Sequence, residues 1–198
     1  KTPFARMKYD DAINDYGSDK PDLRFDMKLI DVTNIFRNSS FELFKNSEIV
    51  NCLVVKDSAS KYSRKSLDEL GLFVKKYGLG GLAYLKFGEE VTGSVVKALN
   101  DDEISSLKKN LKIEDNDLVL FGCGEKKKVK QALGALRCKL GKDLKLYNEN
   151  DLAYLWVVDF PSFEYSEEEQ RFVSCHHPFT SPKDEDIDKL ISDKANCY

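Results

Sequence analysis

The only two histidines of the 198-residue chain, His176 and His177, are adjacent in the stretch RFVSCHHPFTSPKD at residues 171–184. An imidazole can ligate a metal, act as an acid or base, or bind a carboxylate or phosphate. Neighbouring residues of an extended strand point to opposite faces, and Pro178 favours an extended His177, so the two rings are poorly placed to share one ion. Since no cysteine stands at ligand spacing either, we expect no metal site.

A dyad of Cys175 with a histidine is a second possibility for this stretch, because a thiolate activated by an imidazole is a nucleophile. No local spacing supplies the electropositive setting that such a thiolate needs, so a buried structural thiol is favoured and no catalytic residue is assigned. Two interpretations remain open. Either one histidine faces a pocket, where it binds a carboxylate or a phosphate, and its neighbour packs in the wall, or both are simply buried.

A second group of charged residues surrounds Pro21 in the stretch GSDKPDLR, where Asp19, Lys20, Asp22 and Arg24 lie within six residues. Such a stretch is usually a solvated turn or an ion-paired joint, and this interpretation is favoured. The alternative is a loop that presents Lys20 or Arg24 to an anionic ligand.

The strongest helical pattern covers residues 126–144. An apolar stripe of Val129, Leu133, Leu136 and Leu140 runs along one side, with Lys128, Lys139 and Lys142 roughly opposite. These lysines could follow the phosphates of an RNA, although charged helix faces are more often only solvated. Arg137 lies at the edge of the stripe, so it either reaches a specific partner or extends its charged end into water.

Composition places the chain among soluble globular proteins, with 41% apolar and 33% charged residues. The longest apolar run, residues 152–158, is too short to span a bilayer, and no signal segment is evident. Five cysteines without a CxxC pair argue against a zinc finger or a disulfide framework and favour reduced thiols. Because the chain begins without Met, we expect it to be a piece of a longer protein.

Elements that must position these side chains follow from periodicity and turn signals. Helices are expected at residues 9–16, from residue 31, at 62–78 with Ser63 as N-cap, at 101–112 and at 126–144. Strands are expected at residues 48–57, twice within 81–96, and at 117–123. This order predicts an α+β fold, an antiparallel sheet with helices packed on one face.

The last quarter of the chain has a different pattern. Residues 152–164 form a nearly continuous apolar run, which predicts a strand covered on both faces. The acidic stretch YSEEEQ leads back to RFVSCHH, so the two segments are expected to form a hairpin of a larger sheet. Too little chain remains to supply the rest of that sheet.

Five stretches in fixed order carry a family resemblance: PFARMKYDDAINDYGSDKPDLRF, SRKSLDELGLFVKKYGLGGLAYLK, ALGALRCKLGKDL, WVVDFPSFE and HHPFTSPKD. Together they resemble bacterial-type aspartyl-tRNA synthetases of class II. The resemblance implies that residues 29–149 are an α+β insertion domain related to one in tRNA-dependent amidotransferases. Residues 1–28 and 150–198 would be incomplete flanks of the antiparallel catalytic sheet.

The same resemblance implies an activity for the parent protein, a cytoplasmic homodimer that uses ATP and Mg²⁺ to join L-aspartate to the 3′ end of tRNA. It implies that His176 contacts aspartate, with His177 a secondary candidate, that Asp19, Lys20, Asp22 and Arg24 form an active-site loop, and that Lys128, Lys139 and Lys142 face tRNA. Nothing matches the anticodon-binding barrel or the three class II motifs, so the piece alone is expected to be inactive and to hold no cofactor. The alternative is a self-contained tRNA- or protein-binding module.

Overall fold

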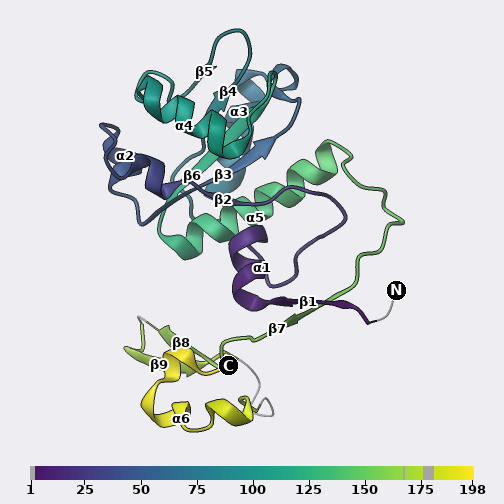
Figure 1. Cartoon of the computed structure of the whole chain (residues 1–198), viewed down its shortest axis with the longest axis vertical. Helices are drawn as coiled ribbons and strands as arrows, with labels where there is room; N and C mark the ends of the chain where they lie inside the picture. Colours follow the sequence, from purple (N-terminus) through teal and green to yellow (C-terminus); the bar gives the residue numbers. More distant parts are fainter. Residues whose placement is uncertain (1–2, 167, 176–180) are drawn as a thin grey trace. The chain divides into compact units, whose positions relative to one another are not determined.

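The computed structural model describes residues 3–166, 168–175 and 181–198. The chain forms two compact units, one of Lys1–Ala12 with Tyr154–Tyr198 and the other of Ile13–Ala153 (Figure 1). The boundary between them falls within helix α1 (Tyr9–Tyr16), whose bounds are those predicted from the sequence. The two candidate aspartate-binding residues, His176 and His177, lie outside the described residues.

The larger unit is built on one antiparallel sheet of five strands. In sheet order the strands are β2 (Ile30–Asp31), β3 (Ile49–Val55), β6 (Leu118–Gly124), β4 (Ala83–Lys86) and β5 (Thr92–Gly93). The central pair β3–β6 joins segments about 60 residues apart along its whole length, with Leu53 opposite Leu120. The α+β fold with an antiparallel sheet is therefore confirmed.

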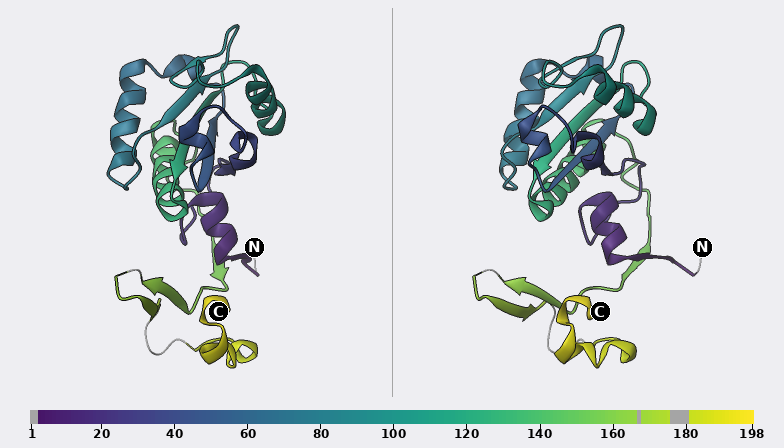
Figure 2. Two further views of the ribbon diagram at one scale, coloured as in Figure 1. Left: turned by 90° about the vertical axis from the view of Figure 1, so that its left-hand side faces the viewer. Right: turned by 60° about the vertical axis from the view of Figure 1, so that its left-hand side comes forward.

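Helices cover both faces of this sheet, whereas the sequence pattern suggested one. On one face lie α3 (Arg64–Lys75) and α5 (Lys126–Asp143); on the other lie α2 (Glu42–Lys45), α4 (Asp101–Leu111) and the 3-10 turn η1 (Thr33–Phe36) (Figure 2). The reason is visible in β3 and β6, which are apolar at successive positions and so present a buried row to each side. A further 3-10 turn, η2 (Ala59–Lys61), precedes α3.

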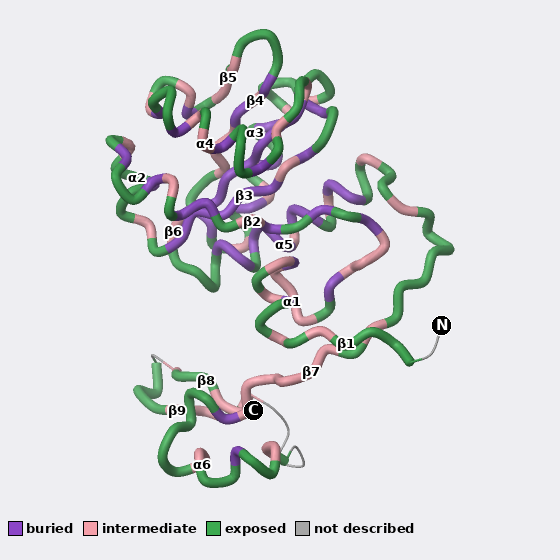
Figure 3. Tube along the Cα trace, viewed as in Figure 1, coloured by how far each residue is buried: buried purple, intermediate pink, exposed green. Residues whose placement is uncertain are grey.

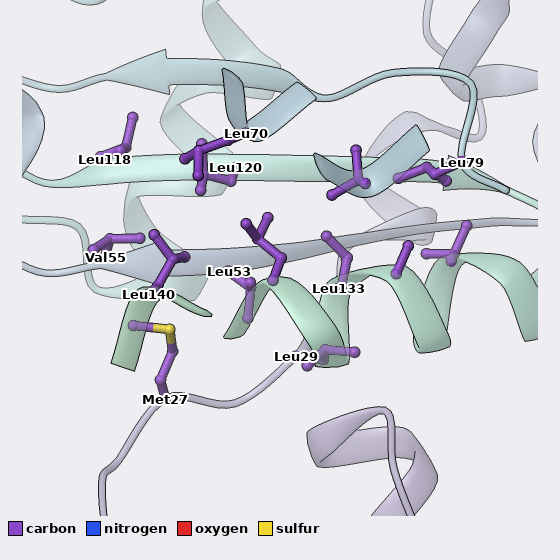
Figure 4. Close-up of a cluster of buried hydrophobic side chains, with 14 of the residues drawn as sticks. Met27, Leu29, Leu53, Val55, Leu70, Leu79, Leu118, Leu120, Leu133 and Leu140 are labelled. Atoms are coloured by element: carbon purple, nitrogen blue, oxygen red, sulfur yellow. The ribbon is translucent and has the colours of Figure 1, made fainter. Parts of the chain in front are cut away.

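Two separate apolar clusters result. The cluster on the α3 and α5 face contains Leu53, Leu120 and the whole predicted stripe of α5, all fully buried, and Figure 4 shows leucines of the strands and of α5 pointing toward one another. The opposite cluster contains Cys52 and Phe121. Figure 3 shows the same strands as the buried centre of this unit.

Helix starts follow the capping chemistry of the sequence. The Ser63 hydroxyl accepts a hydrogen bond from the Ser66 N–H at 3.2 Å, which confirms the predicted N-cap of α3. Asn100 and Glu103 form a reciprocal capping box at the start of α4, with both hydrogen bonds under 3 Å. The helix expected from residue 31 is wrong beyond a single 3-10 turn, because Asp31 pairs in the sheet with Asn51 instead.

The smaller unit contains two pairs of short strands. Strand β1 (Ala5–Lys8) runs parallel to β7 (Leu155–Val158), and β8 (Phe163–Ser166) is antiparallel to β9 (Arg171–Ser174). The chain ends in η3 (Asp184–Asp186), α6 (Lys189–Ser192) and η4 (Lys194–Asn196). A hairpin is present as β8–β9, but it contains only the last two residues of the apolar run, Phe163 and Glu164, because β7 pairs with β1 instead.

The apolar run at residues 152–164 departs from its prediction in two ways. It is two strands and not one, because the chain bends after β7 at Asp159, whose φ is +58°, and at Pro161. It is also not covered on both faces, since Trp156 is 59% exposed. Among the described residues β7 pairs with β1 alone, so no second partner strand buries it. No helix in the described parts of the chain has the length and apolar character to cross a bilayer.

Candidate functional site

The loop that follows α1, residues 17–29, is fastened to helix α5. At its start Gly17 has φ +68°, a conformation that favours glycine, and an added Cβ would collide with the Lys130 carbonyl. On the helix, a Cβ added to Gly134 would lie 2.7 Å from the carbonyl oxygens of both Gly17 and Tyr16. The two glycines therefore permit a close contact between the backbone of the loop and the backbone of α5.

Arg137 is the second point of attachment, and its side chain is fully buried. Its guanidinium donates to the main-chain carbonyls of Asp22 at 2.8 Å, of Phe25 at 3.0 Å and of Met27. The guanidinium carbon also lies 4.0 Å from the centroid of the Phe25 ring. Arg137 thus reaches a specific partner, which was one of its two predicted roles, and that partner is backbone.

The far end of the loop packs into the core. Phe25 lies against Gly141, where an added Cβ would be 2.5 Å from the ring. Phe25, Met27 and Leu29 are buried while Asp26 and Lys28 are exposed, which is the alternation of an extended segment with one buried side. Figure 4 shows Met27 and Leu29 beside α5. The Leu29 N–H donates to the Asp15 carbonyl at 2.7 Å, so the loop closes back on α1.

Within this loop Asp22 and Arg24 form a two-point ion pair. Arg24 donates from Nε at 2.9 Å and from Nη2 at 2.7 Å to the two carboxylate oxygens of Asp22. The Arg24 side chain lies over the Tyr147 ring, with its guanidinium carbon 3.9 Å from the centroid. Hydrogen bonding to Arg24 lowers the pKa of Asp22, and the same pair raises the pKa of Arg24.

Asp19 and Lys20, the other two charged residues of the stretch GSDKPDLR, have no ion-pair partner among the described residues, whereas Lys28 at the far end of the loop pairs with Asp15 at 2.7 Å. Lys20 is exposed and Asp19 is half-buried. The Lys20 N–H donates to the Ser18 hydroxyl at 3.0 Å, which fixes the backbone and leaves the ammonium in solvent. The loop is therefore an ion-paired joint at Asp22 and Arg24 that also carries one solvated cation, Lys20.

The three lysines proposed for the outer face of α5 have different surroundings. Lys128 pairs with Glu125 at 2.5 Å and Lys139 pairs with Asp143 at 2.7 Å, both within the helix. Lys142 is exposed and has no acidic partner in the described part of the chain. It lines a hollow of about 380 Å³ at the end of α5, together with Gly141, Lys145, Tyr147 and Glu149.

Several residues of α5 and of the segment after it were not predicted as functional from the sequence. Tyr147 and Lys145 follow the helix in a segment without periodicity, so no pattern distinguished them. Lys130 is buried and donates to the Asn14 carbonyl at 2.9 Å, and its burial lowers the pKa of its ammonium. A usable signal did exist for Gly134, Arg137 and Gly141, because their spacing of three and four places them on one helical face and glycine is unfavourable inside a helix.

The cysteines and the metal-ligating residues give no site in the described regions. No disulfide joins the cysteines, all of which lie in the described residues, and burial raises the pKa of the Cys52 thiol. The Cys175 N–H donates to the Ser162 carbonyl at 3.0 Å, which places Cys175 directly after β9. No three His, Cys, Asp or Glu side chains within residues 3–166, 168–175 and 181–198 gather as metal ligands.

Comparison with known proteins gives two findings. Residues 41–133 match the GAD domain family; this range runs from α2 to the middle of α5. Over 193 residues the chain is 50% identical to the aspartate–tRNA ligase of Geobacillus kaustophilus, covering 95% of this chain and 33% of that protein.

Two further relatives agree. The aspartate–tRNA ligase of Halalkalibacterium halodurans is 49% identical over 199 residues and that of Streptococcus agalactiae 47% over 194 residues, each covering 98% of this chain and 33% of the relative. The chain thus spans about a third of the length of the relatives it matches. Residues 41–133 are thus similar to the GAD domain, and nearly the whole chain is similar to about a third of the length of the aspartate–tRNA ligases of these bacteria.

Proposed function

We propose that this chain is part of a longer aspartate–tRNA ligase. That enzyme would activate L-aspartate with ATP to aspartyl-adenylate and transfer the aspartyl group to the 3′ end of tRNA. The observation that carries the proposal is the identity of about 50% over nearly the whole chain, which includes both units and the loop between α1 and β2.

In this proposal residues 1–28 and 150–198 belong to the catalytic region, and residues 29–149 form the insertion domain. The exposed Trp156 supports the assignment, because β7 is apolar enough to be covered on both sides and has one partner strand among the described residues. Further strands of a longer enzyme would cover it. Residues 13–28 hold a special position, since they are assigned to the catalytic region yet pack on α5.

A chimeric enzyme tests the proposal. The segment of the Geobacillus relative that aligns with this chain is replaced by the chain, and tRNA aspartylation is measured. We expect clear activity, and none when the segment is replaced by a flexible linker. A well-folded chimera that does not aspartylate tRNA would contradict the proposal. The 198-residue chain alone should show no aspartate-dependent pyrophosphate exchange.

For aspartate itself we propose His176 as a binding residue and His177 as a secondary one. In the active chimera, His176→Ala should raise the KM for aspartate much more than the KM for ATP, because the imidazole would contact only the amino acid. His177→Ala is the matched control, with a smaller change in the KM for aspartate. Equal increases in the two KM values of His176→Ala would argue for a structural histidine.

ATP and Mg²⁺ would be used by the longer enzyme, which we propose to be a cytoplasmic homodimer. Within residues 3–166, 168–175 and 181–198 no acidic cluster suits a divalent ion, so we place no magnesium site on them. We propose that the basic face of α5, with Lys128 near its start and Lys139 and Lys142 near its end, faces tRNA. Of these three, Lys142 is the one without an acidic partner in the described regions.

A second candidate is a self-contained binding module for tRNA or protein. It is favoured by one observation, that residues 13–153 form a compact unit with their own two-sided core around the GAD match. A tRNA-binding titration of the chain at several salt concentrations tests it. Phosphate contacts would weaken steeply with added salt, and Lys142→Ala would flatten that slope. Lys109→Ala on α4 is the control. If it flattens the salt dependence of tRNA binding as much as Lys142→Ala does, a binding site at the end of α5 is contradicted.

A further inference from the structure

Arg137 is an unusual residue for the interior of the larger unit. A buried guanidinium loses its hydration, and its N–H groups must find acceptors within the protein. Here the acceptors are three main-chain carbonyls of Asp22, Phe25 and Met27, and no carboxylate is hydrogen-bonded to it in the described residues. The free-energy cost of removing water from the Arg137 guanidinium is therefore offset by hydrogen bonds to the carbonyls of one stretch of loop backbone.

These three bonds fix the path of the loop. Backbone carbonyls at three positions within six residues cannot all meet one planar group unless the segment between them adopts a single conformation. The contact of Gly17 with Gly134 fixes the start of the loop, and the contact of Phe25 with Gly141 fixes its end. Gly134, Arg137 and Gly141 therefore form one contact face on α5, which we call the clasp.

The conformation that the clasp imposes on the loop leaves one of its basic side chains without an acidic partner, so that this side chain can bind an anionic group. Asp22 and Arg24 neutralise each other, and Arg24 is further held on Tyr147. Lys28, the third cation of the loop, pairs with Asp15 at 2.7 Å. Lys20 is exposed and is therefore the loop cation without an acidic partner among the described residues. Lys20 is two residues from the Asp22 carbonyl that Arg137 binds, so a shift of that carbonyl moves Lys20 with it.

We propose that Arg137 is a positioning residue for the aspartylation reaction. It holds the loop of residues 17–29 so that Lys20 meets an anionic group, a carboxylate or a phosphate, of the bound substrates. The inference rests on the proposed function, because it names a further residue of that reaction. It also connects α5, the helix in which the GAD match ends, to the loop assigned to the catalytic region.

The test uses the active chimera and three variants, Arg137→Lys, Lys20→Ala and the double variant. Lysine keeps the positive charge but cannot bind three carbonyls with a planar fork. We expect Arg137→Lys to lower kcat/KM for tRNA aspartylation on the order of 10- to 100-fold, as a misplacement of about 1 Å can do. Because Arg137 acts through the loop, adding Arg137→Lys to the Lys20→Ala variant should lower kcat/KM by less than about twofold.

A control separates positioning from stability. Leu107→Ala removes a fully buried side chain of α4 from the cluster on the opposite face of the sheet, so it destabilises the unit without touching the loop. At a temperature where all variants are folded by circular dichroism, Leu107→Ala should keep kcat/KM within about twofold of the unmodified chimera. An equal loss in Leu107→Ala and Arg137→Lys would overturn the inference.

A second test of the inference remains valid even if Arg137→Lys prevents the protein from folding. Gly134→Ala pushes on the carbonyls of Gly17 and Tyr16 and should shift the same loop, with the same dependence on Lys20. Gly71→Ala in α3 is the matched control, because an added Cβ there meets no atom within 4 Å. In the 198-residue chain, hydrogen exchange of the Leu29 N–H should accelerate in Gly134→Ala and in Arg137→Lys, and not in Gly71→Ala.

The outcomes are distinct. A folded but inactive chimera contradicts the proposed function and the role of Arg137 with it. An active chimera in which Arg137→Lys and Lys20→Ala act independently, so that their losses multiply, overturns the role of Arg137 alone. Unchanged exchange at Leu29 in both loop-shifting variants would overturn it as well.

Discussion

The two units of this chain bury their apolar residues to very different extents. In the unit of residues 13–153, strands β3 and β6 are apolar at successive positions, and helices cover both of their faces. In the other unit β7 has the same apolar character, yet Tyr154 and Trp156 are exposed on it. Similar strand sequences thus have different surroundings, and the surroundings decide which residues contribute to stability.

The comparison shows in which strands a substitution will lower the free energy of unfolding. Residues of β3, β6 and α5 contact neighbours on every side, so their loss leaves a cavity. Residues of β7 are in contact with water in this chain, so the same loss changes little. Four substitutions test this contrast, beginning with the one expected to have the largest effect.

Phe121→Ala should destabilise the larger unit by about 3–5 kcal/mol, because it removes an aromatic ring that is buried at the centre of β6 and packs against Phe36 and Phe44. Urea unfolding followed by circular dichroism measures the change. A loss below about 1 kcal/mol would show that the second face of the sheet is not a packed core.

Gly17→Ala should destabilise the same unit by about 1–3 kcal/mol, because alanine is strained at φ +68° and its Cβ would collide with the carbonyl of Lys130. Gly81→Ala is the control, since an added Cβ there meets nothing within 4 Å. Equal unfolding midpoints for the two variants would contradict the close contact of the loop with α5.

Asp22→Asn should cost about 1 kcal/mol at neutral pH, since the ion pair with Arg24 is half-buried. The folded-state pKa of Asp22 lies below its ordinary value of 3.8, so the paired carboxylate stabilises the fold above pH 4. That contribution is lost as the pH falls through the lower, folded-state pKa. The difference between the chain and Asp22→Asn should therefore shrink in acid, and a difference that grows in acid would refute the pair.

Trp156→Ser should change the unfolding free energy of the chain by no more than about 0.5 kcal/mol, because the indole is 59% exposed. In the active chimera the same substitution should be far more damaging, if further strands cover β7 there. The comparison of the two unfolding experiments measures how much of the burial of β7 comes from outside this chain. An equal effect in both would argue against the catalytic-region assignment.

Much of the local structure could be predicted from the sequence. The expected helix at 126–144 is α5, Lys126–Asp143, and its four-residue stripe is buried as predicted. Ser63 caps α3, and the two strands within 81–96 are β4 and β5. These succeed because the signals act between residues a few positions apart, through helical spacing, capping hydroxyls and turn glycines.

The candidate site was less accessible to sequence reasoning. The charged loop stood out by composition, but its internal pairing did not, since any of its acids could have met either cation. The structure selects Asp22 with Arg24 and leaves Lys20 in solvent. Of the outer lysines on α5 it likewise separates Lys142 from the ion-paired Lys128 and Lys139.

The sequence by itself determined the helices α1, α3, α4 and α5, the N-cap of α3, the buried stripe of α5 and, through its family resemblance, the parent enzyme proposed here. Only the tertiary structure decided that helices cover both faces of the sheet, that β1 pairs with β7, and that Arg137 binds the loop before β2. For the last two the physical reason is that the contacts join positions more than 100 residues apart, through backbone groups that every residue carries. A carbonyl has no sequence signature, so its partner becomes known only when the chain is folded.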